Sequence, residues 1–190
     1  MSKYGDKYPW LRRKDWEDEN DICEDGYAWD HFDDLPKGWV DAFGELLLEE
    51  LDNAIKKAGY ENEFVILQAK EKYGSMRLYH TPTNQEIGDI VSKYEVLSQN
   101  ICCVCGKPDS YMLTRLGWIS PFCEDCFNKH INDTRKYEEV IGENNKMADT
   151  LKYRQYSKEF DSPGWKNFEI DISETAEKIR KRWEERTNKR

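Results

Sequence analysis

Long apolar runs are missing from this chain of 190 residues. A helix that crosses a bilayer needs roughly 18 or more consecutive apolar residues, and no stretch approaches that length. The first ten residues, from Met1 to Trp10, are mostly polar and contain no apolar core of the kind that a secretory signal has. We therefore expect a cytoplasmic protein without a membrane span, whose thiols are kept reduced.

Motifs of familiar catalytic chemistry are missing too. The sequence has no nucleophile elbow, no phosphate-binding Gly-rich loop and no His-Glu-x-x-His. Its three histidines, His31, His80 and His130, are scattered. A nuclease of the HNH type places a catalytic histidine between two Cys-x-x-Cys pairs, and the spacer 106–122 contains none. We therefore expect a binding protein rather than an enzyme.

The charge is negative and unevenly distributed, with a net value of −9. Residues 1–60 carry 16 acids and 8 bases, whereas residues 151–190 carry 8 acids and 11 bases. Acidic surfaces repel phosphate backbones, so we do not expect binding to duplex nucleic acid, except through the basic tail or a local cluster. Electrostatic attraction within the chain, between the acidic residues 1–60 and the basic residues 151–190, explains the same distribution.

Two Cys-x-x-Cys pairs, Cys102 with Cys105 and Cys123 with Cys126, are separated by 17 residues. This spacing predicts a structural Zn²⁺ site in which four thiolates complete a tetrahedral shell and leave no open catalytic position. We expect Gly106 to adopt a positive φ and to turn backbone N–H groups toward the sulfurs. A disulfide framework and a redox-active pair are the alternatives. Cys23 and Cys103 are predicted to lie outside the site.

The periodicity predicts an α+β fold: a small antiparallel sheet packed with amphipathic helices, an embedded four-cysteine module of the zinc-ribbon type and a mainly helical C-terminal tail. Apolar residues recur every three or four positions from Val40 to Ala58, so we expect a helix capped by Asp33 or Asp34 and ended by Gly59. The segment 83–86 matches a capping box that begins at Thr83, and the apolar pattern behind it predicts a second helix ending near Ser98.

Between these helices the sequence predicts a hairpin with a turn at Tyr73 and Gly74. Its first strand begins at 64–67, where both faces are apolar, so we expect that strand in the sheet interior. Cationic and aromatic side chains gather around the turn and are suited to holding a phosphate or a base, although a solvated strand face explains them equally well. The candidate ligand-binding residues are Lys70, Lys72, Tyr73, Arg77, Tyr79 and His80.

Three regions follow from this pattern. Residues 1–100 are predicted to form an α+β core with an acidic N-terminal arm, which aromatic residues such as Trp10, Trp16 and Phe32 fix to the core. Residues 101–130 form the zinc module, with short strands between the cysteine pairs. Residues 131–190 form a polar, mostly helical extension: broken helices to residue 156, a possible strand over 168–172, and a last helix capped by Ser173.

Several short motifs are spread over roughly residues 8–127. They are Tyr8-Pro9, Leu35-Pro36-x-Gly38-Trp39, Lys70-Glu-Lys-Tyr-Gly-Ser-Met-Arg77-x-Tyr79, Lys93-Tyr-Glu95, Cys102-x-x-Cys105-Gly-Lys-Pro108, Gly117-Trp118 and Cys123-x-x-Cys126. Together these motifs resemble a family of uncharacterised small proteins encoded by phages and prophages. This resemblance implies a protein in the cytoplasm of a host bacterium that acts on host machinery or antiviral defence.

Three binding functions remain open from the sequence. The chain binds and inhibits a host protein through its acidic aromatic segment or its tail, or it sequesters a nucleotide signal of host defence on the hairpin. The third hypothesis is a regulator that binds nucleic acid, for which a steep loss of affinity with added salt is the expected mark.

Overall fold

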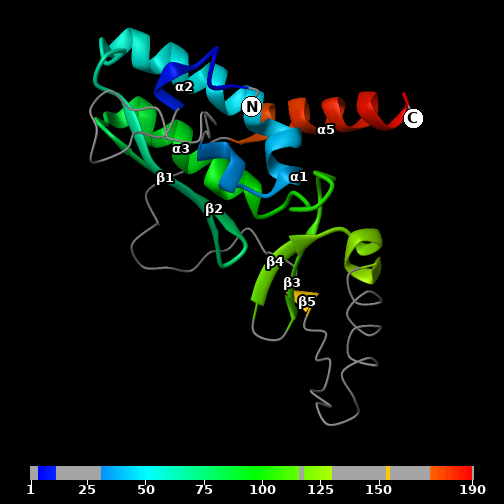
Figure 1. The fold of residues 1–190 in the computed structure, drawn as a ribbon. Helices are drawn as coiled ribbons and strands as arrows, with labels where there is room; N and C mark the ends of the chain where they lie inside the picture. The colour runs from blue at the N-terminus through cyan, green and yellow to red at the C-terminus, as the bar shows by residue number, and fades with distance from the viewer. Residues whose placement is uncertain (1–3, 12–30, 116–117, 130–152, 155–171, 190) are drawn as a thin grey trace.

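The computed structural model has the predicted α+β architecture, with a two-stranded antiparallel hairpin, packed helices, a four-cysteine cluster and a C-terminal helix (Figure 1). Residues 168–171 of the strand predicted over 168–172, most of the acidic segment and Cys23 lie outside the described residues. Within the part of the chain that is described, no helix is long and apolar enough to cross a membrane. The described residues are 4–11, 31–115, 118–129, 153–154 and 172–189.

The predicted helix at 40–58 is confirmed, and the helical residues begin at Lys37. Three segments follow one another without a break: α1 (Lys37–Trp39), the π-helical turn η3 (Val40–Gly44) and α2 (Glu45–Ala58). Gly59 ends the run at φ 75°, and its N–H donates to the carbonyls of the last turn.

The predicted aspartate cap of this helix is wrong. Pro36 occupies the N-cap position, and its carbonyl accepts from the N–H groups of Trp39 and Val40. Asp33 and Asp34 lie in the preceding 3-10 turn η2 (His31–Asp34). The fixed φ of proline suits the start of a helix, so the chain turns at Pro36 rather than at an aspartate.

The second helix, α3 (Gln85–Ser98), ends at the expected residue, but its capping box is wrong by one position. Asn84, not Thr83, is the N-cap, and its Oδ1 accepts from the N–H of Ile87 at 2.9 Å. Glu86 does not reach back to the cap, because its carboxylate pairs with Lys57 of α2 at 2.8 Å.

The hairpin is confirmed, with β1 (Val65–Lys72) paired to β2 (Ser75–Thr81). Tyr73 and Gly74 form its two-residue turn with φ of 53° and 78°, as a type I′ turn requires. The expected interior position of the first strand is wrong, because β1 and β2 form a two-stranded sheet. A bulge at Leu67 interrupts the pairing and leaves that side chain 41% exposed.

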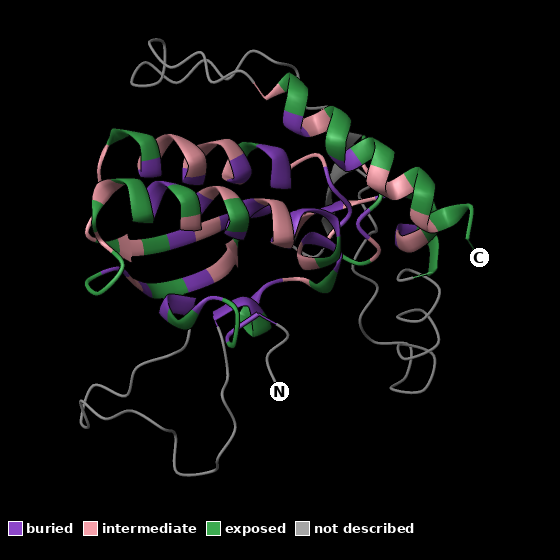
Figure 2. Ribbon diagram, turned by 90° about the horizontal axis from the view of Figure 1, so that it is seen from above, coloured by how far each residue is buried: buried purple, intermediate pink, exposed green. Residues whose placement is uncertain are grey.

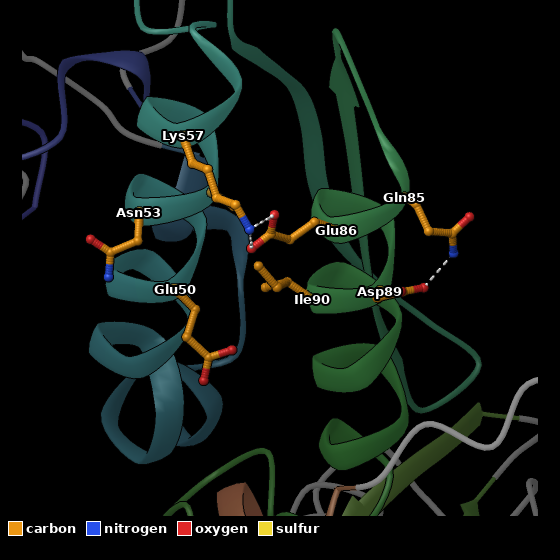
Figure 3. A pocket seen from close by; sticks show the side chains of 8 residues that line it. Glu50, Asn53, Lys57, Gln85, Glu86, Asp89 and Ile90 are labelled. Atoms are coloured by element: carbon orange, nitrogen blue, oxygen red, sulfur yellow. Dashed lines mark hydrogen bonds and ion pairs between the residues drawn. The ribbon is translucent and has the colours of Figure 1, made fainter.

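Helices α2 and α3 lie antiparallel beside each other (Figure 3). Lys57 near the end of α2 pairs with Glu86 near the start of α3, while Glu50 binds Lys93 and accepts from the Tyr94 hydroxyl at 2.9 Å. Buried and exposed residues alternate along both helices and the hairpin (Figure 2). The fully buried side chains include Trp39, Phe43, Leu47, Leu51, Ile55, Met76, Ile87 and Tyr94.

The edge of β2 is bonded to α3. The N–H of Met76 donates to Ser98 Oγ at 2.9 Å, and the N–H of Leu78 donates to Glu95 Oε1 at 3.3 Å. Two strands alone are marginally stable in water, so the hairpin depends on this helix for both apolar cover and hydrogen-bond acceptors.

The predicted aromatic anchoring of the N-terminal arm is confirmed for the residues that the structure describes. Trp10, in the 3-10 turn η1 (Pro9–Leu11), is buried edge-on against Phe64 with ring centroids 5.4 Å apart. Its Nε1 donates to Asp52 Oδ1 at 3.3 Å. Phe32 is buried as well, whereas Trp16 lies outside the described residues.

The cysteine module contains a three-stranded sheet in the order β4-β3-β5. Strands β3 (Tyr111–Arg115) and β4 (Trp118–Phe122) form the predicted hairpin between the cysteine pairs. The short strand β5 (Tyr153–Arg154) pairs with β3, in a region for which the sequence predicts broken helices. Strand pairing over two residues gives no periodic signal in a sequence.

The last helix, α5 (Ser173–Thr187), is confirmed in position, with Ile179 buried and Ala176 and Trp183 half-buried. Its predicted cap is wrong, because Ser173 is already the first helical residue and Ile172 is the N-cap.

Replacing Asn84 by Ala removes the cap of α3 and is expected to lower the free energy of unfolding by about 1 kcal/mol. For a chain of this size we expect a fall in melting temperature of about 2–4 °C. Thr83→Ala is the matched control and should melt like the parent. Equal losses in the two variants would contradict the assignment of Asn84 as the cap.

Candidate metal centre

The four predicted cysteines are brought together. One sulfur from each of Cys102, Cys105, Cys123 and Cys126 lies within 4.8 Å of the others, and the cluster is a candidate metal site. Cys105 Sγ and Cys123 Sγ are 3.7 Å apart, well beyond the roughly 2.05 Å of a disulfide bond. All four thiols are free, so a disulfide framework does not describe this cluster.

Each cysteine pair comes from a tight turn of a different element. The first pair follows the end of α3, where Gly106 has the expected positive φ of 80°. The second pair follows β4 and begins the helical residues 124–129, where the N–H of Phe127 donates to the carbonyl of Cys123 at 3.0 Å. The N–H of Cys103 donates to the Pro121 carbonyl at 2.9 Å and ties the first turn to β4, the strand that leads into the second pair.

Backbone N–H groups stabilise the Cys102 thiolate. Burial works against its ionisation, but N–H groups of Cys105, Cys123 and Val104 outweigh burial and lower the pKa of Cys102. The N–H of Gly106 itself donates to the Cys102 carbonyl, so Gly106 shapes the turn without binding a sulfur.

For Cys105, Cys126 and Cys103, burial is the largest cause of the pKa shift, and the shift is upward. Burial raises the pKa of the Cys105 thiol to about 11, and it raises the pKa of Cys126 as well. Cys103 stands outside the cluster as predicted and packs against the hydrophobic core, where burial raises its pKa to about 12. Cys103 therefore remains a neutral thiol with a packing role.

Gly38 lets the first cysteine turn approach the continuous helical run of α1, η3 and α2, which we call the main helix. A Cβ atom at this position would lie 2.2 Å from the Cys102 carbonyl oxygen and 2.7 Å from the Cys103 carbonyl. The N–H of Gly38 donates to the Cys103 carbonyl at 2.9 Å, and the buried Trp39 indole donates to Ile101 at 2.9 Å. The cluster is therefore fixed to the core by backbone contacts that exclude any side chain.

Two arginines of α5 bind the same turn. Arg186 Nη2 donates to the Cys105 carbonyl at 2.8 Å, and Arg180 makes a bidentate pair with Asp109 at 2.7 and 3.0 Å. Hydrogen bonding from Arg180 lowers the pKa of Asp109. Helix α5 is therefore attached to the segment 105–109.

Arg77, a predicted ligand-binding residue, is engaged within the fold. Its Nη1 lies 2.6 Å from Ser75 Oγ, 2.9 Å from the Met76 carbonyl and 3.4 Å from Glu95 Oε2. Burial raises the pKa of Glu95, and the Arg77 charge and the Leu78 N–H oppose this shift. These polar contacts give Arg77 a structural role, because they link β2 to Glu95 of α3.

The remaining hairpin candidates divide between two faces. His80 lies on the opposite face from Arg77, stacked on Phe64 at 5.4 Å, and burial lowers its pKa. The outer face, with Tyr73, Tyr79 and two lysines, stays accessible. Lys70 Nζ lies 5.3 Å from the Tyr79 ring centroid, and Lys72 Nζ lies 5.5 Å from that of Tyr73.

Sequence reasoning missed the residues that position the cluster. Gly38 and Trp39 were visible as a Pro-x-Gly-Trp motif, but nothing in the sequence indicates that this motif contacts the cysteine turn. Arg186 lies in a tail with many lysines and arginines, and the sequence does not distinguish it from the others. Glu95 is part of a motif of the phage-type resemblance, and its contact with Arg77 gives that motif a physical role.

Comparisons with known proteins return no relative: no family model, no curated protein and no solved structure matches this chain. The resemblance to phage-encoded proteins therefore stays a prediction.

Replacing Gly38 by Ala is expected to lower the free energy of unfolding by about 2 kcal/mol or more, because the new methyl group overlaps the backbone of the cysteine turn. Gly88→Ala is the control, since no atom beyond its own helix backbone lies within 4 Å of the added Cβ and alanine favours the helix by about 0.5–1 kcal/mol. Urea unfolding measures both. A Gly38→Ala variant as stable as the parent would contradict the close contact.

Replacing Arg77 by Ala is expected to cost about 1–2 kcal/mol, because it leaves the half-buried Glu95 carboxylate without its ion pair. Lys72→Ala should stay within about 0.5 kcal/mol of the parent, since its side chain lies on the surface. Thermal or urea unfolding compares the two variants. If both variants unfold like the parent, Arg77 has no structural role and returns as a binding candidate.

Proposed function

We propose that this chain is a non-enzymatic binding protein, stabilised by one structural Zn²⁺, which recognises another protein through the outer face of its hairpin. The observation that carries the proposal is the exposure of large apolar and aromatic side chains on that face. A protein of the host bacterium is the partner that the resemblance implies.

The donor set of the cluster suits zinc. In a tetrahedral site with Zn–S bonds of about 2.3 Å, neighbouring sulfurs are about 3.8 Å apart, and Cys105 and Cys123 are 3.7 Å apart. Thiolates are ligands for soft or borderline cations and not for Mg²⁺ or Ca²⁺. Four sulfur ligands leave no position for a reacting water, so the ion would stabilise the fold.

The outer hairpin face is defined here as Leu67, Lys70, Lys72, Tyr73 and Tyr79. Its three large apolar side chains are 41%, 73% and 44% exposed for the leucine and the two tyrosines. Among the side chains whose burial is described, only two other large apolar ones are exposed, and they lie apart on α3 and the cysteine turn. Tyrosine is enriched at protein interfaces, where it contributes contact area and a hydroxyl group.

The charge of this face indicates the chemistry of its partner. Two lysines flank the tyrosines on a chain whose net charge is −9. Such a local cationic patch favours a partner surface with carboxylates beside apolar groups, which complements both the charge and the aromatic rings.

Binding of a nucleotide signal is the second candidate, and the two lysine–tyrosine pairs favour it. Two observations count against it. Arg77 is already engaged, and a hollow of the described surface lies elsewhere, between α2 and α3 (Figure 3), with Glu50, Glu86 and Asp89 in its lining. Carboxylates repel phosphate, and small-molecule sites are normally concave. A thermal-shift scan with nucleotides tests this candidate, because a tight ligand raises the melting temperature.

Protein purified without added zinc is expected to contain one Zn²⁺ per chain by elemental analysis. Cys123→Ser should lose the metal and destabilise the cysteine module, since metal binding contributes directly to folding. Cys103→Ser is the matched control and should keep the metal. Parent protein without metal, with its thiols oxidised in pairs, would contradict the proposal.

The hairpin proposal predicts a discrete cross-link from the outer hairpin face. A photo-reactive residue in place of Tyr73 or Tyr79, in protein produced in bacterial cells, should capture the same partner protein. The same residue in place of Val96 on α3 is the control and should capture none. Lys72→Glu should weaken capture by adding charge repulsion. Capture from position 96 alone, or no capture from the hairpin, would overturn the proposal.

A further inference from the structure

We propose that docking of α5 and metal binding at the four cysteines are thermodynamically linked, so that loss of the metal releases α5 from the core. The inference rests on the proposed zinc site. It follows from where α5 is attached, from how little apolar surface it buries, and from what fixes its attachment point.

Apolar contact alone holds α5 weakly. Thr175 and Ile179 are its buried residues, and much of the rest of the helix is exposed (Figure 2). Arg182 adds an ion pair with Glu45 at 3.5 Å, with both side chains 40% or more exposed. Exposed pairs of this kind contribute little to docking.

The strongest polar contacts of α5 reach the segment 105–109. Arg186 donates to the carbonyl of Cys105, a ligand candidate, and Arg180 forms its bidentate pair with Asp109. The Arg180 and Asp109 side chains are themselves 51% and 65% exposed, so their pair exceeds an ordinary surface pair only through its bidentate geometry. The Arg186 contact is part-buried, with that side chain 32% exposed, and it contributes more to docking. Docking of α5 therefore depends on the position of the first cysteine turn.

The Arg186 guanidinium is held in place for this contact. Its Nη1 donates to the Asp41 carbonyl at 3.1 Å, and it lies 4.9 Å from the Trp183 ring centroid. A Cβ at Gly106 would come within 3.0 Å of Arg186 Nη2, so the guanidinium packs directly on the turn. Arg186 thus joins the helix α5, the start of the main helix and the cysteine turn.

The metal would determine whether this attachment point exists. The turn 102–106 is short, and closure of the four-sulfur cluster holds it against the second cysteine pair. When the ion leaves, like-charged or protonated thiols no longer hold the turn, and the Cys105 carbonyl loses its fixed position. By linkage, docked α5 strengthens metal binding by the same factor by which the bound metal strengthens docking, so a substitution that undocks α5 weakens metal binding by up to that factor.

Hydrogen exchange of the full-length, zinc-loaded protein tests this linkage. Amides of α5 are expected to exchange about tenfold or more faster after a chelator removes the zinc, while amides in the middle of α2 change less. Arg186→Ala should lower the zinc affinity, measured by competition with a chromogenic chelator, by about 5–10-fold. Lys178→Ala, whose ion pair is with Glu174 in the same helix, is the matched control and should bind zinc like the parent.

The outcomes separate this inference from the proposed zinc site. Zinc bound at the four cysteines, with α5 exchange unchanged on its removal and Arg186→Ala at parental affinity, would overturn the linkage alone. Absence of zinc binding in the parent would overturn both. Arg180→Ala provides a second variant if Arg186→Ala does not fold, and it should show the same direction of change.

Discussion

The rest of the structure depends on one close backbone contact, between Gly38 at the start of the main helix and the carbonyls of Cys102 and Cys103. Main chain packs directly on main chain there, so neither partner can shift without moving the other. The buried Trp39 extends the same contact into the core through its hydrogen bond to Ile101. The cysteine cluster is consequently joined to the helical core by fixed geometry, and its closure would determine how the helix start is held.

Helix α3 stabilises the two-stranded hairpin from one side, and the outer hairpin face stays accessible to solvent. Helix α3 provides acceptors for the edge of β2 through Ser98 and Glu95, and Arg77 balances the Glu95 charge. The inner face is buried, with α3 against β2 and the turns η1 and η2 against β1. The outer face has no such cover in the described structure, and its tyrosines and lysines give it the chemistry of a recognition surface.

Local patterns in the sequence predicted the elements but not what joins them. The apolar periodicity located the two helices, the turn at Tyr73 and Gly74 located the hairpin, and the cysteine spacing located the cluster. The first residue of a helix was harder to predict than the helix itself. Asn84 and Thr83 are both good N-cap residues, and tertiary contacts decide between them. Glu86 illustrates this competition, since an ion pair with Lys57 displaces its predicted role in the capping box.

Arg77, which we predicted to bind a ligand, shows which contacts a sequence does not reveal. An arginine on a strand looks the same whether it binds a ligand or a carboxylate of its own chain, and Glu95 lies on another element. Likewise, Gly38 and Arg186 act through backbone carbonyls of the cysteine turn, and a carbonyl carries no sequence signal. Only the three-dimensional structure reveals contacts of this kind.

Zinc K-edge X-ray absorption of the purified protein tests the central claim most directly. The account predicts a single shell of four sulfur atoms at about 2.3 Å from the ion. A shell that contains nitrogen or oxygen ligands, or fewer than four sulfurs, would show that these cysteines do not form the closed centre on which the fold and the docking of α5 are argued to depend.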